Sequence, residues 1–151
     1  MKKRFLIAIG IAAAIVPIRA AAPASHAAAP MLLTVYKDPD CGCCKSWVEY
    51  MRKHGYRVET KDTRDLDQVN AAVGVPSKLA GCHTALVGGY VISGHVPAED
   101  IARLLKTKPK IVGLAVPGMP AGSPGMEGPP PVHYQVIAFE RSGKTSVFAN
   151  H

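Results

Sequence analysis

The sequence predicts one α/β domain, in which a mixed β-sheet is flanked by helices. Short apolar, β-branched runs alternate with segments whose apolar residues recur every three or four positions. Gly, Pro and Asp mark the breaks between these segments. Their order is strand, helix, strand, helix, hairpin, helix, which favours a sheet covered by helices. The chain has 151 residues, enough for a single domain with its own hydrophobic core.

The first elements follow directly from the pattern. Residues 31–36 are an apolar run typical of a buried strand. A helix begins at Cys43, because Cys44, Trp47 and Met51 recur at helical spacing, and it ends at Gly55. Residues 56–61 alternate and predict a second strand.

The middle of the chain predicts a second helix, a hairpin and a third helix. Residues 66–73 have helical spacing behind N-cap candidates at 62, 63 and 65. Residues 84–92 form a hairpin pattern around a Gly-Gly pair. A proline and two acids at 97–100 open another helix.

The last part of the chain differs in composition. Between residues 113 and 131, 11 of 19 residues are Gly or Pro. We therefore expect this whole stretch to be a loop without regular structure. Residues 133–139 and 145–148 then predict a C-terminal β-hairpin extension.

The N-terminus has the layout of a secretory signal peptide. Basic residues at 2–4 precede an apolar run over 5–17 and a stretch of small residues up to residue 29. We expect cleavage between residues 22 and 29, which leaves residues 30–151 as a single domain in the periplasm. The alternative is a membrane anchor, but the apolar run is short for a span of about 30 Å.

The net charge does not indicate a nucleic-acid partner. The formal charge is +7, but the first 30 residues hold four basic and no acidic residues, which leaves +3. The sequence also lacks a basic-aromatic patch, a phosphate-binding loop and a Ser-His-Asp set. After signal cleavage we expect no membrane contact.

Four cysteines carry the chemistry of the chain: Cys41, Cys43, Cys44 and Cys82. An even number in an exported protein often means structural disulfides, which is one alternative. Three of the four are clustered, however, and a bridge between adjacent residues is strained. The cluster is therefore better explained as a redox centre or a metal site.

The surroundings of the cluster favour reactive thiolates. The motif lies at the start of a helix, where free N–H groups stabilise a thiolate, and Lys37 and Lys45 flank it. Cys41 and Cys44 have the Cys-x-x-Cys spacing of redox proteins. Because the motif stands between the first strand and the first helix, we expect a thioredoxin-like fold.

The turn before the hairpin strengthens the metal interpretation. In a thioredoxin-like fold this turn faces the cysteine motif and normally carries a cis-proline. Here Cys82 and His83 occupy it. A thiol and an imidazole at this place favour metal binding.

The sequence resembles the CopG-like copper-resistance proteins. The resemblance covers nearly all of residues 31–149 and implies a thioredoxin-like fold, an exported location and copper binding through the cysteines. It rests on five segments: VYKDPDCGCCKSW at 35–47, GCHT at 81–84, GHVP at 94–97, GLAVPGMP at 113–120 and GSPGME at 122–127.

Cu(I) suits this cysteine set better than Zn²⁺. A single Zn²⁺ on four thiolates would leave excess negative charge, which burial penalises. Cys43 and Cys44 would also have to point at one ion, although neighbours on a helix face apart. Bridging thiolates shared among several Cu(I) ions remove both difficulties.

Other side chains are weaker candidates for the metal. His83 adds a nitrogen donor that would also tolerate Cu(II). Met119 and Met126 are soft thioethers in the Gly/Pro-rich loop, where they either bind copper or cover the core. His95 is interpreted as a capping or loop residue, with a ligand role as the alternative because it belongs to the shared GHVP segment. Trp47 is interpreted as core beneath the motif.

Three functions remain open. The first is an exported protein that holds Cu(I) in copper resistance or handling, together with other periplasmic copper-handling proteins. The second is a thiol or copper oxidoreductase that uses Cys41 and Cys44. The third is an exported structural domain with a passive metal site.

Overall fold

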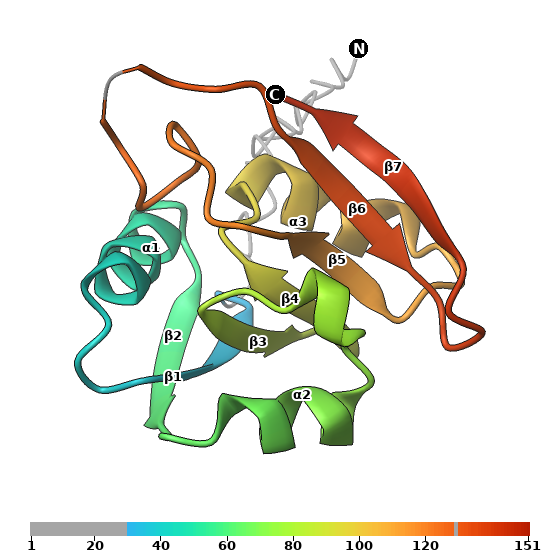
Figure 1. Cartoon of the computed structure of the whole chain (residues 1–151), viewed down its shortest axis with the longest axis horizontal. Coiled ribbons are helices and arrows are strands. Elements are labelled where there is room, and N and C mark those ends of the chain that lie inside the picture. Colours follow the sequence, from blue (N-terminus) through green and yellow to red (C-terminus); the bar gives the residue numbers. More distant parts are fainter. Residues whose placement is uncertain (1–29, 129) are drawn as a thin grey trace, which may run out of the picture.

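The computed structural model describes residues 30–128 and 130–151. The expected signal peptide, residues 1–29, lies outside the described residues. Within them the chain forms one seven-stranded sheet and three α-helices (Figure 1). No helix in this part is long and apolar enough to cross a membrane.

The bounds of the elements agree with most of the predicted segments. The strands are β1 (Leu32–Lys37), β2 (Arg57–Asp62), β3 (His83–Val87), β4 (Tyr90–Gly94), β5 (Gly113–Val116), β6 (Gln135–Phe139) and β7 (Thr145–Asn150). The helices are α1 (Gly42–Lys53), α2 (Leu66–Val73) and α3 (Ala98–Thr107), with a short 3-10 turn at Ser77–Leu79.

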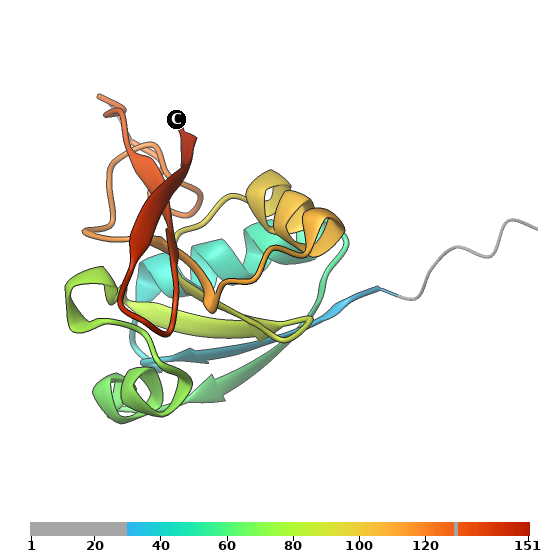
Figure 2. The same cartoon turned by 90° about the vertical axis from the view of Figure 1, so that its right-hand side faces the viewer.

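The sheet is mixed and has the order β2-β1-β3-β4-β5-β6-β7. The pairs β1–β2 and β4–β5 are parallel, and the other pairs are antiparallel. Helices α1 and α3 cover one face and α2 lies on the other (Figures 1 and 2). An α/β fold with helices on a mixed sheet is therefore confirmed.

The two faces of the sheet contribute to separate apolar clusters. Along β4, Ile92 packs with the larger cluster that contains α1 and α3, whereas Val91 joins the smaller one. In β5, Leu114 and Val116 belong to the first cluster and Ala115 to the second. This alternation follows from the two-residue period of a strand.

One boundary of the predicted Gly/Pro-rich loop was wrong. Residues 113–116 are not loop but strand β5, which pairs with β4 and β6 in the middle of the sheet. Gly113 is needed there because a Cβ atom would collide with the backbone of Val91. Proline first interrupts the chain at Pro117, where the strand ends.

Helix α1 is capped by a sulfur atom. Cys41 is the N-cap, and its Sγ accepts a hydrogen bond from the amide of Cys44 at 3.3 Å. No acidic residue lies in the first turn, and Arg52 and Lys53 stand in the last turn. No acidic side chain within this first turn therefore competes with the cysteine motif for the positive end of the helix dipole.

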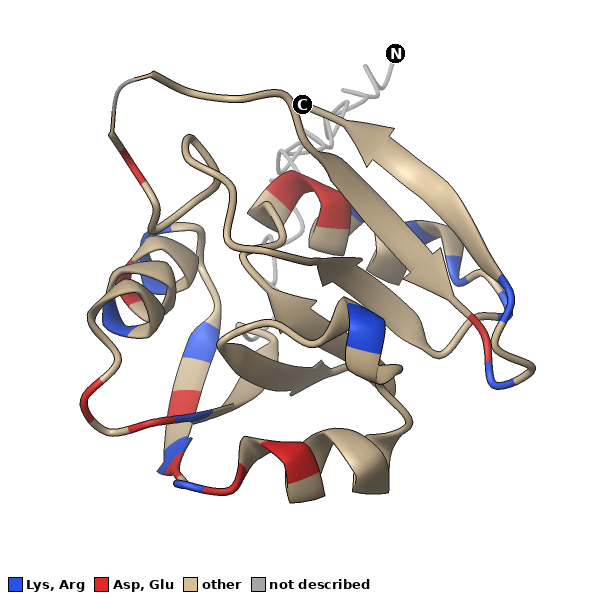
Figure 3. Cartoon of the chain, in the orientation of Figure 1, with Lys and Arg blue, Asp and Glu red and all other residues tan. Residues whose placement is uncertain are grey.

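Positions of Lys and Arg and of Asp and Glu are interspersed along the chain (Figure 3). Arg64 pairs with Asp40 at 3.1 Å, and both side chains are exposed, so this ion pair adds little stability. The loop over residues 117–134 has a different character, because Glu127 is its single charged residue.

Candidate metal centre

The cysteine motif lies between the end of β1 and the start of α1, as the sequence predicts. Cys41 and Cys44 are joined by a disulfide, with their Cα atoms 5.4 Å apart. Cys44 is fully buried, whereas Cys43 is half-buried and free. One turn of helix thus holds three sulfur atoms at the edge of the core.

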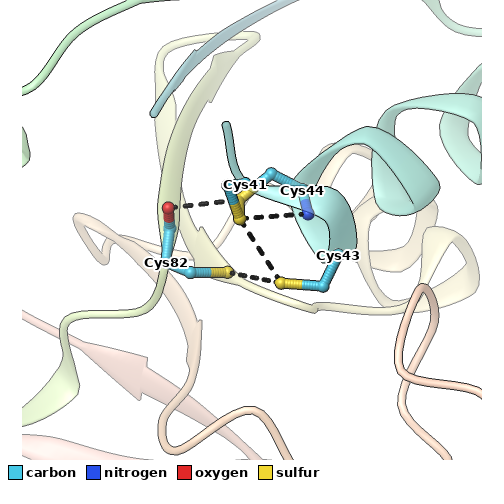
Figure 4. Close-up of side chains that lie close together, drawn as sticks. All are labelled: Cys41, Cys43, Cys44 and Cys82. Carbon is cyan, nitrogen blue, oxygen red and sulfur yellow. Dashed lines mark hydrogen bonds between the residues drawn. A yellow bond between two sulfur atoms is a disulfide. The ribbon is translucent and has the colours of Figure 1, made fainter. Parts of the chain in front are cut away.

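Cys82 brings the fourth sulfur to the motif from the turn before β3. Its Sγ lies 3.7 Å from that of Cys43, which in turn lies 3.4 Å from the Sγ of Cys41 (Figure 4). The sulfur of Cys44 lies 3.3 Å from the carbonyl oxygen of Cys82. The four sulfur atoms all lie within 4.8 Å of one another, so one small group of ions can contact all of them.

Two imidazoles lie on the other side of Cys82. Its Sγ is 3.0 Å from Nε2 of His95 and 3.5 Å from Nδ1 of His83. The three donor atoms lie within 4.8 Å of one another. His83 was a predicted site residue, and the structure brings it to the cysteines.

His95 lies closer to the cysteines than the sequence indicates. It lies in the loop between β4 and α3, as expected, but it caps no helix, because Pro97 is the N-cap of α3, and it is fully buried beside Cys82. Its place in the GHVP segment was the sequence feature that could indicate a position near the metal site. A histidine that follows a glycine is, however, also common in loops without a metal. Only the return of β4 beside β3 puts it next to the thiol.

A close approach of two glycines positions Cys82 and His95. A Cβ atom on Gly81 would lie 2.5 Å from the Cα of Gly94. Gly94 itself has φ +71°, in the left-handed region that favours glycine. The backbones at Gly81 and Gly94 can therefore be in contact. Each of these glycines is directly followed by a donor residue, Cys82 or His95.

Burial keeps the imidazoles neutral. Desolvation, and then the nearby His95, lower the pKa of His83 to about 3. Desolvation also lowers the pKa of His95, although its hydrogen bond to the Pro124 carbonyl opposes this. Neutral imidazoles keep a lone pair for a metal ion at neutral pH.

Burial also keeps Cys82 protonated. Desolvation, and then the neighbouring Cys43, raise the pKa of the Cys82 thiol to about 12. Binding of a metal must then release this proton, so the ion replaces a proton in a site of low charge.

The two lysines expected to stabilise thiolates have different surroundings. Lys37 is buried, but its Nζ pairs with Asp62 at 2.8 Å, which offsets its charge. Lys45 is exposed on α1. A lowered pKa of a motif thiol therefore depends chiefly on the helix N-terminus and stays a prediction.

The Gly/Pro-rich loop reaches the site. The carbonyl of Pro124 lies 2.7 Å from Nδ1 of His95, and Gly125 packs on the backbone of α1 at Cys43 and Trp47. Figure 1 shows this loop passing beside α1. Met119 is exposed and Met126 half-buried, and their role as ligands stays a prediction.

Known structures with a similar fold and sequence identify the family. Two structures of a copper resistance protein CopG, Form 1 and Form 2, are 42% and 41% identical to this chain, with TM-scores of 0.76 and 0.77. Each match covers 81% of this chain and 98% of the other. This chain belongs to the CopG family of copper resistance proteins.

Two further comparisons complete this result. Residues 79–126, which include Cys82, His83, His95 and the first part of the loop, match the family model of a protein of unknown function, DUF411. No curated protein matches the chain. The resemblance to CopG-like proteins inferred from the motifs is thus confirmed.

Proposed function

We propose that this CopG-family chain is an exported copper-binding protein that holds Cu(I) in copper resistance or handling. The site would be polynuclear, with thiolates that bridge the ions. Its ligands are Cys41, Cys43, Cys44 and Cys82. The proposal rests on one observation: four sulfur atoms from two separate parts of the chain lie within 4.8 Å of one another.

Bridging follows from the positions of the sulfurs. In the disulfide form Cys41 and Cys44 are bonded to each other, so copper binding requires their reduction. The reduced sulfurs of adjacent Cys43 and Cys44 leave the helix in different directions, so they suit different ions better than one. Soft thiolates prefer Cu(I), and one Cu(I) per thiolate gives a neutral group in a desolvated place.

We assign the fold to the thioredoxin-like class. The order β2-β1-β3-β4, with β1 and β2 parallel and a β3–β4 hairpin before α3, supports this assignment. The position of the motif between β1 and α1, opposite the turn before β3, supports it as well. The loop and the β6–β7 hairpin are then an extension of this core.

The location and the partners belong to the same proposal. The basic, apolar and small-residue stretches before residue 30 favour export to the periplasm. There the partners would be copper ions and other periplasmic copper-handling proteins.

Anaerobic titration of the reduced protein with Cu(I), against a competing chelator, tests the function. The protein should bind more than one Cu(I) per chain, and Cys82→Ser should lower that number. Ser46→Ala, on the exposed side of α1 near the motif, is the matched control and should leave it unchanged. Saturation at one equivalent, unaffected by Cys82→Ser, would rule out the polynuclear site.

The Cys41–Cys44 disulfide favours a second candidate function, that of a thiol or copper oxidoreductase. When two thiols close to a disulfide they release two electrons and two protons, so they reduce one Cu(II) per thiol to Cu(I). Turnover then needs an external thiol that reduces the disulfide again.

Copper reduction under a supply of small-molecule thiol separates the two functions. An oxidoreductase produces Cu(I) over many cycles, at a rate above that of the thiol alone, and Cys41→Ser should lose this activity. A storage protein reduces at most one set of Cu(II) ions per chain, and Cu(I) production then stops. Mass spectrometry of the disulfide after each round shows which pair of thiols is oxidised.

A further inference from the structure

The end of the sheet opposite the metal centre carries a basic surface. Five exposed side chains form it: Lys106, Lys108, Lys110, Arg141 and Lys144. Among the residues that the structure describes, none of the five forms an ion pair. With Glu140, the one acid in these two segments, they give a formal charge of +4, whereas residues 30–151 as a whole carry +3. The basic surface therefore holds all of the excess positive charge of the domain.

The sheet brings the two basic segments side by side. The amide of Val112 donates a hydrogen bond to the carbonyl of Phe139 at 2.9 Å, and Lys110 and Arg141 line one cavity of about 590 Å³. Figure 3 shows basic positions on both segments, where the chain after α3 passes the β6–β7 turn. Gly89, in the turn after β3, lines the same cavity, whereas Cys82 directly precedes β3. The length of β3 thus separates the basic surface from the metal centre.

Lys108 has a backbone conformation that favours glycine. It is the C-cap of α3, with φ 47° and ψ 51° in the left-handed region. Helix α2 ends in the same region with Gly74, the residue type that commonly ends helices in this way. The left-handed conformation strains any residue with a Cβ atom, and residues held in it are often functional. The side chain of Lys108 has no ion-pair partner in the described part of the chain that would offset this strain.

Apolar side chains lie among the basic ones. Met31 is 47% exposed and Leu32 is 38% exposed. Met31 also lines a cavity together with Lys108 and the half-buried Leu105 and Ile111. Lysines beside exposed apolar side chains suit the surface of a bilayer, because the ammonium groups reach lipid phosphates while the apolar groups enter the headgroup region. An acidic protein would use the charges but would not need the exposed Met31 and Leu32.

The chain enters the domain at this same end. Met31 directly precedes β1, and the cysteine motif follows the other end of that strand. The apolar run over residues 5–17, which belongs to the proposed export signal, precedes Met31. During export across a membrane, the basic surface is therefore the part of the domain next to the segment that carries the signal.

We propose that the basic surface, together with Met31 and Leu32, binds a membrane surface that contains anionic phospholipids, with the metal centre facing away from the bilayer. Four of the five cations are lysines, whose compact charge suits a fluid array of phosphates, whereas arginine suits fixed two-point contacts. Anionic lipids attract such cations strongly only close to the surface. The inference goes beyond the proposed function and does not depend on copper. It replaces the expectation, drawn from the sequence, that the domain makes no membrane contact.

Co-sedimentation with lipid vesicles tests the proposal. The protein is used from residue 30 onwards without copper, because this part contains the whole sheet, its helices and both apolar clusters. It should bind vesicles of equal parts phosphatidylcholine and phosphatidylglycerol, but not pure phosphatidylcholine, and added salt should weaken the binding. Lys108→Gln and Lys110→Gln should each weaken it roughly five-fold. Lys78→Gln, an exposed lysine in the turn before Cys82, is the matched control and should change nothing.

Lys108→Gly separates a loss of binding from a loss of folding. Glycine adopts the left-handed conformation without strain, so this variant should melt at a higher temperature than the wild type. It should nevertheless bind the anionic vesicles as weakly as Lys108→Gln does. Wild-type vesicle binding by Lys108→Gly would overturn the role of this lysine.

Polyglutamate distinguishes a membrane from an acidic protein. Met31→Gln should weaken vesicle binding several-fold and leave the affinity for polyglutamate unchanged. Tighter binding to polyglutamate than to the vesicles, with no effect of Met31→Gln on either, would point to an acidic protein and overturn the membrane proposal.

Hydrogen exchange on the vesicles locates the contact. Amides at 31–32 and 106–112 should exchange more slowly with vesicles present, whereas those at 41–47 and 81–84, around the metal centre, should not change. No binding to anionic vesicles at low salt, or protection at the metal centre instead of the basic surface, would refute the proposal. Neither result depends on the Cu(I) stoichiometry, so this inference and the proposed function can fail separately.

Discussion

The indole ring of Trp47 lies against the imidazole of His83, with ring centroids 4.3 Å apart and both side chains fully buried. Its Nε1–H donates a hydrogen bond to the carbonyl of Val96 at 3.0 Å, one residue after His95. Trp47 is core beneath the motif, as the sequence predicts, and it also supports both histidines. The buried face of α1 and the imidazole side of the site are therefore one packed unit.

Trp47 should report copper binding. It is the only tryptophan of the chain, and its ring contacts a residue beside the cysteines. Because bound copper quenches a fluorophore at short range, copper should lower the tryptophan emission of the reduced protein in step with uptake. Cys82→Ser should reduce the quenching. An emission that stays constant while copper saturates the protein would mean that copper binds elsewhere.

Cys82 should react slowly with alkylating agents. Burial raises its pKa to about 12, so at pH 8 almost none of it is thiolate, the reactive form. In the apo protein with the Cys41–Cys44 disulfide intact, pulse alkylation followed by mass spectrometry should show Cys82 labelled much more slowly than an unfolded peptide thiol, with a rate that still rises above pH 9. In denaturant the difference should vanish. Rapid labelling of folded Cys82 at pH 7 would contradict this.

The apo protein should lose stability on acidification through its buried histidines. His83 has a pKa lowered from 6.5 to about 3, so the unfolded chain binds more protons between these values. Stability is therefore full above pH 6.5 and falls as the pH drops towards 3, by at most about 5 kcal/mol. Melting curves across this range measure the slope. His83→Phe should flatten it and exposed His54→Ala should not; equal slopes in all three proteins would refute this origin.

The two loop methionines should slow copper release if they contact the ion. Met119→Ala and Met126→Ala should then speed the loss of Cu(I) to a chelator, while the melting temperature of the apo form hardly changes. Met119 is exposed, so its replacement removes little packing. Release at the wild-type rate in both variants would show that the loop acts only through Pro124 and Gly125.

Most of the elements could be predicted because their signals are local. The period of Cys44, Trp47 and Met51 is the buried face of α1, and the Gly88-Gly89 pair is the turn between β3 and β4. Strand β5 was missed for a physical reason. It has four residues inside a Gly/Pro-rich stretch, and its stability comes from pairing with β4 and β6 on both sides rather than from its own pattern.

The site, like the fold, has features that follow from local sequence and features that follow from long-range packing. The donor types, the helix N-terminus under Cys41–Cys44 and the family could be predicted, because they depend on spacing along the chain. Which donors lie next to one another depends on how the strands pack. Cys82 and His95 come together only because β3 and β4 pair and Gly81 lies against Gly94, and the Pro124 carbonyl selects the nitrogen of His95 that faces the sulfur. Long-range contacts of this kind arise from packing of the whole domain, which no local period encodes.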